Sequence, residues 1–174
     1  LQEGDVLTID AGVFHKGYHT DHAKTVIVGE NSDPAVVQFL KVGELTLAKA
    51  IGKVRIGARL GELSSCIQQE IESAGYNVVK QLTGHGIGRE LHEEPYVPNF
   101  LAQPIEQTLQ MMPGLVIAIE PIYTMGSGEM IYEKDKGGSI VTKDGSLSAQ
   151  FEHTVALTDK NMIIFANSQK FIFD

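Results

Sequence analysis

Cysteine, basic residues and long apolar runs are all scarce in this 174-residue chain, and each scarcity excludes a class of protein. Cys66 is the only cysteine, so no disulfide can form within the chain and a reducing compartment is expected. No apolar run is long enough to cross a membrane. Lys and Arg total 14 against 22 Asp and Glu, and the formal charge of −8 argues against a surface that binds nucleic-acid phosphates.

The overall composition indicates one globular domain. Hydrophobic residues make up 43% of the chain and charged residues 21%, which suits a single domain with an ordinary core. The chain opens on Leu1 in place of Met, and residues 1–5 resemble the end of a loop that enters a strand. We therefore expect a segment of a longer protein.

The order of predicted elements indicates an α+β fold. Strands are predicted over 6–13 and 18–28, joined as an antiparallel hairpin. One helix is predicted to begin at Pro34, and a second carries an apolar stripe from 60 to 74. Further strands are predicted over 78–82, 115–119, 139–142, 151–157 and 162–165, and a long ordered loop over 89–112. Two helices among mainly antiparallel strands give the α+β class.

Side chains that could bind divalent cations occur in strand-like contexts along the whole chain. They are Asp10, Asp21, His85, Glu120 and Glu152. Four carboxylates in one half-buried site would repel one another, and two divalent cations would neutralise them. Two ions about 3.5–4 Å apart need an oxygen-rich, partly shared ligand set of this kind. Any one of these acids alone is more simply explained as a solvated surface residue, whereas the set favours a metal site.

The acids are placed by the strands that the sequence predicts. Asp10 and Asp21 lie on the two strands of the hairpin, where a facing register would let both bind the same cations. Glu120 follows a wholly apolar strand, so its carboxylate must leave the core or meet a partner. Glu152 is expected inside the strand 151–157 as the last ligand.

The most specific signal is a histidine flanked by glycines. Gly84, Gly86 and Gly88 remove side chains around His85, which lets backbone and ligand approach closely. A phosphate-binding loop is excluded because no Gly-Lys-Ser/Thr follows. His92 lies seven residues on and could face a substrate at the same site. The remaining histidines, expected to be structural or solvent-facing, are His15, His19, His22 and His153.

Taken together, these motifs resemble those of the type I methionine aminopeptidase family. The resemblance is carried by Asp10, Asp21, Gly84-His85-Gly86-Ile87-Gly88, His92-Glu93-Glu94-Pro95, Ile119-Glu120-Pro121 and the run from Thr142 to Thr154. It covers residues 1–174, which correspond to the C-terminal part of that family's catalytic domain. It implies the pita-bread fold, a curved antiparallel sheet with helices outside, with the N-terminal half of the domain absent.

The resemblance also implies a dinuclear metal centre. Asp10 would bind one ion, His85 and Glu120 would bind the other, and Asp21 and Glu152 would bridge the two. The ions would be Mn, Fe, Co or Zn, and hard carboxylates with one imidazole suit the first three better than zinc.

The activity that the resemblance implies is removal of the initiator methionine from nascent polypeptides. A metal-bridging hydroxide would attack the carbonyl, Glu120 would shuttle the proton, and His92 would bind the substrate at its scissile amide. The expected partners are the N-termini of nascent proteins and the ribosome, for a cytoplasmic monomer that binds neither nucleic acid nor membrane. Two alternatives stay open: an aminopeptidase of the same fold that cuts Xaa-Pro bonds, and a non-catalytic protein-binding module.

Overall fold

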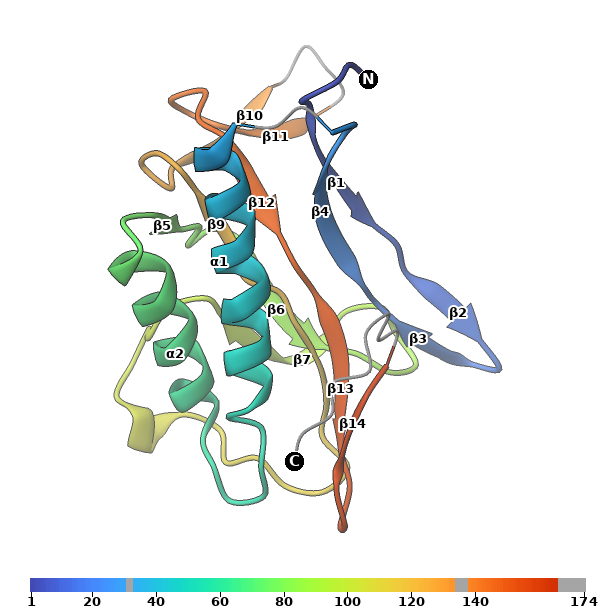
Figure 1. Ribbon diagram of the computed structural model, residues 1–174. Helices are drawn as coiled ribbons and strands as arrows, with labels where there is room; N and C mark the ends of the chain where they lie inside the picture. The colour runs from blue at the N-terminus through green and yellow to red at the C-terminus, as the bar shows by residue number, and fades with distance from the viewer. Residues whose placement is uncertain (31–32, 134–137, 166–174) are drawn as a thin grey trace.

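Two helices pack side by side against one side of a set of antiparallel strands (Figure 1). The computed structural model describes residues 1–30, 33–133 and 138–165. Helix α1 spans Pro34–Ile51 and helix α2 spans Leu60–Ser73, as the sequence predicts. Asp33 caps α1 because its carboxylate accepts a hydrogen bond from the backbone N–H of Ala35 at 2.8 Å. Within these described ranges, neither helix combines the length and the apolarity needed to cross a membrane.

The core lies between the two helices and the strands behind them. Leu63, Ile67 and Ile71 of α2 recur at helical spacing and are all 0% exposed. Each such side chain stabilises the fold by about 1.5–3 kcal/mol when it is fully buried. The strands that flank Glu120 and Glu152 are thereby held against an apolar layer.

The largest sheet is antiparallel and has the strand order β14-β13-β8-β6-β7. Its strands are β14 (Met162–Ile164), β13 (His153–Leu157), β8 (Val116–Ile119), β6 (Thr83–Gly86) and β7 (Glu93–Pro98). The predicted loop over 89–112 is therefore wrong in part, since it contains β7 and a 3-10 turn, Ile105–Gln107. Pro95 and Pro98 are tolerated in β7 because it is an edge strand, where a missing N–H need not break a ladder.

Two smaller sheets are formed by strands that follow the helices. One has the order β12-β9-β5 and consists of β12 (Ser148–Gln150), β9 (Ile122–Thr124) and β5 (Asn77–Val78). The other pairs β10 (Met130–Glu133) with β11 (Ser139–Thr142). The predicted strand 78–82 is wrong, because β5 ends at Val78 and the chain then crosses to the largest sheet before β6 begins.

The N-terminal hairpin is antiparallel as predicted, but it is interrupted. Strand β1 (Val6–Asp10) pairs with β4 (Ala23–Ile27), and β2 (Val13–His15) pairs with β3 (Tyr18–Thr20). Asp21 was expected inside the second strand and instead lies in the break between β3 and β4. Its backbone N–H and C=O both bond the Thr154 hydroxyl, which belongs to another sheet.

Two threonine hydroxyls join this hairpin to the strand pair β12 and β13. Thr25 Oγ1 accepts a hydrogen bond from Gln150 N at 2.9 Å and donates one to Gln150 O at 2.8 Å. Thr154 Oγ1 does the same for Asp21, accepting from its N at 2.8 Å and donating to its O at 2.9 Å. We call these four bonds the threonine seam. It brings together two segments that lie more than a hundred residues apart in the sequence.

Candidate metal centre

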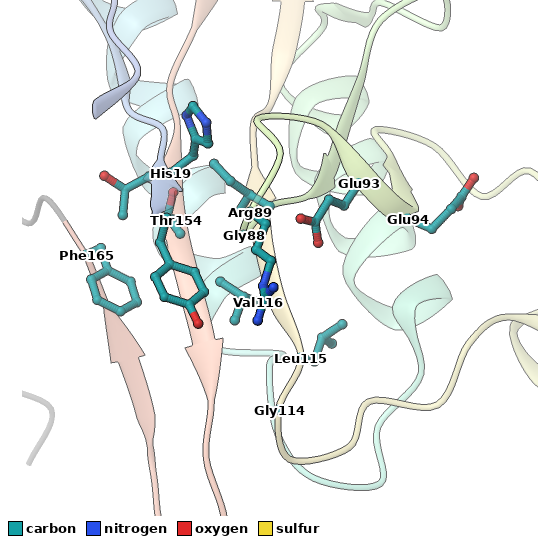
Figure 2. A pocket seen from close by; sticks show the side chains of 13 residues that line it. His19, Gly88, Arg89, Glu93, Glu94, Gly114, Leu115, Val116, Thr154 and Phe165 are labelled. Carbon is teal, nitrogen blue, oxygen red and sulfur yellow. The ribbon is translucent and has the colours of Figure 1, made fainter. Parts of the chain in front are cut away.

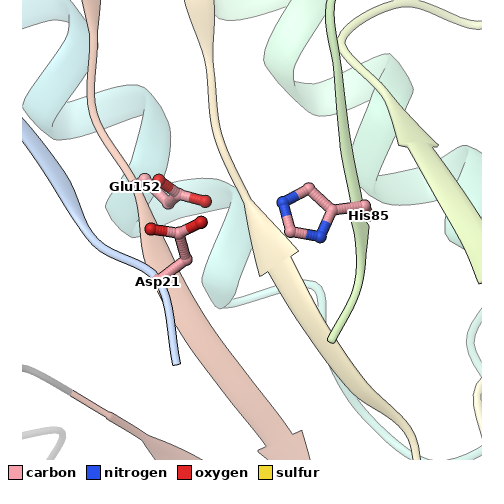
Figure 3. A group of neighbouring side chains, drawn as sticks. All are labelled: Asp21, His85 and Glu152. Atoms are coloured by element: carbon pink, nitrogen blue, oxygen red, sulfur yellow. The ribbon is translucent and has the colours of Figure 1, made fainter. Parts of the chain in front are cut away.

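Three of the predicted ligands converge in one buried cluster. Asp21, His85 and Glu152 each offer a ligand atom, and these atoms lie within 4.8 Å of one another. Their side chains point toward a common centre from three different segments (Figure 3). The residues are 8%, 3% and 1% exposed, respectively. A buried pair of carboxylates facing an imidazole is costly without a counter-charge, which is what a cation provides.

The two glutamates lie opposite each other in matching strand breaks. Strand β12 pairs with β9, and β13 pairs with β8. The break between β12 and β13, at residues 151–152, therefore faces the break between β8 and β9, at residues 120–121. The expectation that Glu152 lies inside a strand over 151–157 is wrong, because β13 begins one residue later. Pro121 has no N–H to donate to Phe151, which faces it, and Phe151 N donates to Pro121 O at 3.3 Å. Glu152 N donates to Ala23 O of the hairpin at 2.8 Å.

His85 directs its Nε2 atom toward the predicted ligands. Its Nδ1 lies 2.8 Å from the carbonyl oxygen of Gly86. Since a carbonyl only accepts, Nδ1 carries the proton and Nε2 keeps its lone pair. Nε2 lies 3.6 Å from Glu120 Oε1. His85 is thus oriented as a neutral ligand, and burial is the main cause that lowers its pKa.

The glycines beside His85 allow neighbouring strands to close on it. A Cβ on Gly84 would lie 2.5 Å from the carbonyl oxygen of Ala118 in β8. A Cβ on Gly86 would overlap the backbone carbonyl of Glu94 in β7. The close approach expected from the sequence is therefore made by strand backbones on both sides of β6.

Asp10 and His92 complete the group of predicted residues at the exposed edge of the centre. Asp10 is the last residue of β1, and its Oδ2 accepts a hydrogen bond from Gln150 Nε2 at 3.1 Å. Burial and the neighbouring charge of Asp21 raise the pKa of Asp10. The His92 ring is exposed, and its centroid lies 4.3 Å from that of His85 in an edge-on arrangement.

The electrostatics of the glutamates fit a site built for cations. Burial, followed by the charges of Asp10 and Asp21, raises the pKa of Glu120 to about 8. Burial, followed by the charges of Glu120, Asp21 and Asp10, raises the pKa of Glu152 to about 9. Glu152 Oε1 is fully buried and has no hydrogen-bond partner. Divalent cations fit this donor set of carboxylates and one imidazole, and would give that oxygen a partner.

One residue that the sequence analysis did not single out, Gln150, contacts the centre directly. Gln150 Nε2 also donates to Glu120 Oε2 at 3.2 Å, so it touches two of the predicted ligands. Gln150 lies two residues before Glu152, and residues at this spacing in an extended segment point to the same face. This spacing was the signal in the sequence that could have placed Gln150 at the centre. His22 and His153 form a further link, with Nδ1 atoms 3.0 Å apart and stacked rings. Burial, followed by the charge of His22, lowers the pKa of His153 to about 4.

A cavity of about 610 Å³ adjoins the strands that carry these residues (Figure 2). Its apolar lining includes Ile87, Leu115 and Val116, and Arg89 and Glu93 supply charge. Thr154, the same residue that bonds Asp21, also lines it. A cavity of this size and lining is typical of sites that bind small molecules or short peptide segments.

Comparison with known proteins identifies the family of this chain. The model of metallopeptidase family M24 matches residues 1–159. The methionine aminopeptidase of Aquifex aeolicus is 40% identical over 164 residues, which cover 94% of this chain and 63% of that protein. The crystal structure of methionine aminopeptidase from Thermotoga maritima superposes with a TM-score of 0.87 at 39% identity, covering 94% of this chain and 64% of that one.

More distant structures share the fold alone. The prolidase from Pyrococcus furiosus gives a TM-score of 0.75 at 21% identity, covering 98% of this chain and 43% of that one. The predicted α+β pita-bread fold is confirmed by these neighbours, and the chain spans about 63% of the length of the Aquifex relative. By the family match over most of its length, this chain belongs to metallopeptidase family M24.

Proposed function

We propose that this chain is the metal-binding part of a methionine aminopeptidase, which removes the N-terminal methionine from polypeptides. The observation that carries the proposal is the buried cluster of Asp21, His85 and Glu152, with one carboxylate oxygen left without a partner. Identity of 40% to a relative named methionine aminopeptidase supports the choice of activity. The activity is proposed for the whole protein, since the chain spans 63% of that relative.

We assign five side chains to two divalent cations. Asp10 would hold one ion, His85 and Glu120 the other, and Asp21 and Glu152 would be shared. Mn, Fe, Co or Zn suits this mixture of oxygens and one imidazole nitrogen. When bound, such ions polarise a carbonyl group and acidify water, which supplies a nucleophile near neutral pH.

The protein's own groups would handle the proton and the substrate. Glu120 would shuttle the proton at the centre; in the metal-free protein burial and the neighbouring acids raise its pKa to about 8, and bound cations would lower it. His92 is exposed beside His85, where its ring can donate a hydrogen bond to the carbonyl oxygen of the scissile amide. No serine or cysteine is needed as a nucleophile in this scheme.

The substrate would be an unblocked peptide N-terminus. A free α-amine could bind one of the two ions, which would restrict the enzyme to peptide N-termini and make it an exopeptidase. N-termini of nascent proteins in the cytoplasm are the proposed physiological substrates. The adjoining cavity is large enough to receive part of the peptide chain.

The proposal is tested with peptides of matched length on the purified whole protein with Mn²⁺ or Co²⁺. Release of methionine from Met-Ala-Ser, with Ala-Pro-Ala left intact, is the expected result. Glu152→Ala is expected to abolish both metal uptake and hydrolysis in a protein that still folds. Cleavage of Ala-Pro-Ala alone would assign an Xaa-Pro aminopeptidase, and metal uptake without hydrolysis of either peptide would assign a binding module.

A further inference from the structure

Within the part of the chain that the structure describes, the side chain of Gln150 donates hydrogen bonds to two of the predicted ligands. Its Nε2 donates to Asp10 Oδ2 at 3.1 Å and to Glu120 Oε2 at 3.2 Å. Asp10 ends β1 and Glu120 lies in the break between β8 and β9, so one nitrogen links acids from two distant segments. These are also the two acids that the proposed assignment gives to different ions.

The backbone of Gln150 is fixed by the threonine seam. Thr25 Oγ1 accepts from Gln150 N at 2.9 Å and donates to Gln150 O at 2.8 Å. Thr25 is 2% exposed, and its Oγ1 lies 2.8 Å from Thr8 Oγ1. Because the Thr25 proton goes to Gln150, Thr8 is the donor in that contact, and the Thr25 hydroxyl has no remaining capacity. Gln150 is therefore held at its backbone N and O, while its side chain extends to Asp10 and Glu120.

The chemistry of an amide suits this position. Its two N–H groups can stabilise two carboxylates through hydrogen bonds without adding a positive charge. A lysine or arginine would make the same bonds but would compete with a divalent cation for the acids. The residues that hydrogen-bond metal ligands set the orientation of those ligands and hence the affinity for metal.

We propose that Gln150 is a positioning residue of the metal centre, which bridges Asp10 and Glu120 and orients their carboxylates for two cations, with Thr25 as its clamp. The proposal rests on the proposed metal site and adds a residue that binds neither metal nor substrate.

The test measures Co²⁺ binding to the whole protein by calorimetry and by the visible spectrum of the bound ion. Gln150→Met keeps the length of the side chain and removes both donors. We expect its affinity for Co²⁺ to fall by about 10- to 100-fold, as for other partners of metal ligands, with an altered spectrum. Gln69→Met is the matched control, because Gln69 is exposed on α2 and its side chain donates a hydrogen bond to Ser65.

The clamp provides a second, independent variant. Thr25→Val removes the hydroxyl at nearly constant volume and should also weaken Co²⁺ binding, whereas Thr25→Ser should restore it. Wild-type affinity for Co²⁺ in both Gln150→Met and Thr25→Val would overturn the proposal. Tighter binding of Co²⁺ by Gln150→Met would also overturn it, because the amide would then be a competitor of the cation. If Gln150→Met does not fold, the Thr25 pair decides alone. Failure of the wild-type protein to bind Co²⁺ would instead refute the proposed function.

Discussion

The hydroxyl of Thr154 bonds both backbone polar groups of Asp21, at 2.8 and 2.9 Å, across 133 residues of sequence. A single side chain thus replaces the strand partner that Asp21 lacks in the interrupted hairpin. Thr154 is 0% exposed, so water cannot take over this role without a rearrangement. The position of Asp21 beside Glu152 therefore depends on one buried hydroxyl.

Replacing Thr154 by Val should destabilise the protein and weaken metal binding together. The substitution leaves a buried N–H and C=O of Asp21 unsatisfied, which costs about 1–3 kcal/mol for each group. Urea denaturation of the metal-free protein and Co²⁺ titration measure the two effects. Thr154→Ser keeps the hydroxyl and should retain most of both properties. Equal stability and affinity in the Val variant would show that the seam is incidental.

Glu152→Gln should separate stability from metal binding. With its pKa raised to about 9, mainly by burial, Glu152 is protonated near neutral pH in the metal-free protein. A neutral amide of similar shape should then fold about as stably as the wild type but take up no metal. Metal analysis after dialysis and thermal unfolding give the two readouts. Glu129→Gln serves as the control, since the exposed carboxylate of Glu129 pairs with the exposed Lys143 and the variant should behave as wild type.

The stability of the metal-free protein should fall as pH rises. Glu120 and Glu152 have folded pKa values of about 8 and about 9 against an ordinary value of 4.5. Between these values the two glutamates bind more protons in the folded state than in the unfolded state, so their stabilising contribution is complete below 4.5 and is lost up to about pH 9. The lowered pKa values of His85 and His153 oppose this slope below 6.5, so the fall in stability is expected mainly above that pH. Urea denaturation in the presence of a chelator at about pH 5, 7 and 9 measures this slope.

Added Co²⁺ should flatten that pH dependence, because metal binding requires deprotonated ligands and becomes stronger as pH rises. A metal-free protein that gains stability from about pH 5 to about pH 9 would contradict the burial of these two acids.

Gly86→Ala should disturb the centre through the backbone. The added Cβ would overlap the Glu94 carbonyl of the neighbouring strand, so β6 and β7 would have to separate. Overpacking of this kind costs about 1–3 kcal/mol, and a shift of β6 would move His85 and lower the metal affinity. Gly52→Ala is the comparison, because Gly52 has helical φ and its nearest obstacle is a carbonyl at 3.3 Å. A fully stable Gly86→Ala with normal affinity would refute the close strand packing.

Local signals in the sequence were enough to predict the helices and the N-terminal hairpin. Asp33-Pro34 marked the start of α1, and the apolar stripe of α2 fixed its buried face. The identities of the acids in strand-like contexts, with His85 between glycines, were also sufficient to select the residues that the structure brings together.

The strand breaks could not be predicted from local sequence. Residues 151–157 have the composition of one continuous strand, and the break before β13 arises because its partner is interrupted at Pro121. The role of Gln150 likewise depends on Asp10, which approaches it only in the folded chain. These features depend on contacts between segments that are far apart in the sequence. The alternation of apolar and polar residues within one strand carries no information about such contacts.

X-ray diffraction from crystals of the whole protein grown with Mn²⁺, recorded with anomalous scattering, tests the central claim most directly. We expect two anomalous peaks in one pocket, one bonded to Asp10 and the other to His85 and Glu120, with Asp21 and Glu152 bonded to both. No peak in that pocket at a saturating Mn²⁺ concentration, or peaks bonded to other side chains, would contradict the account.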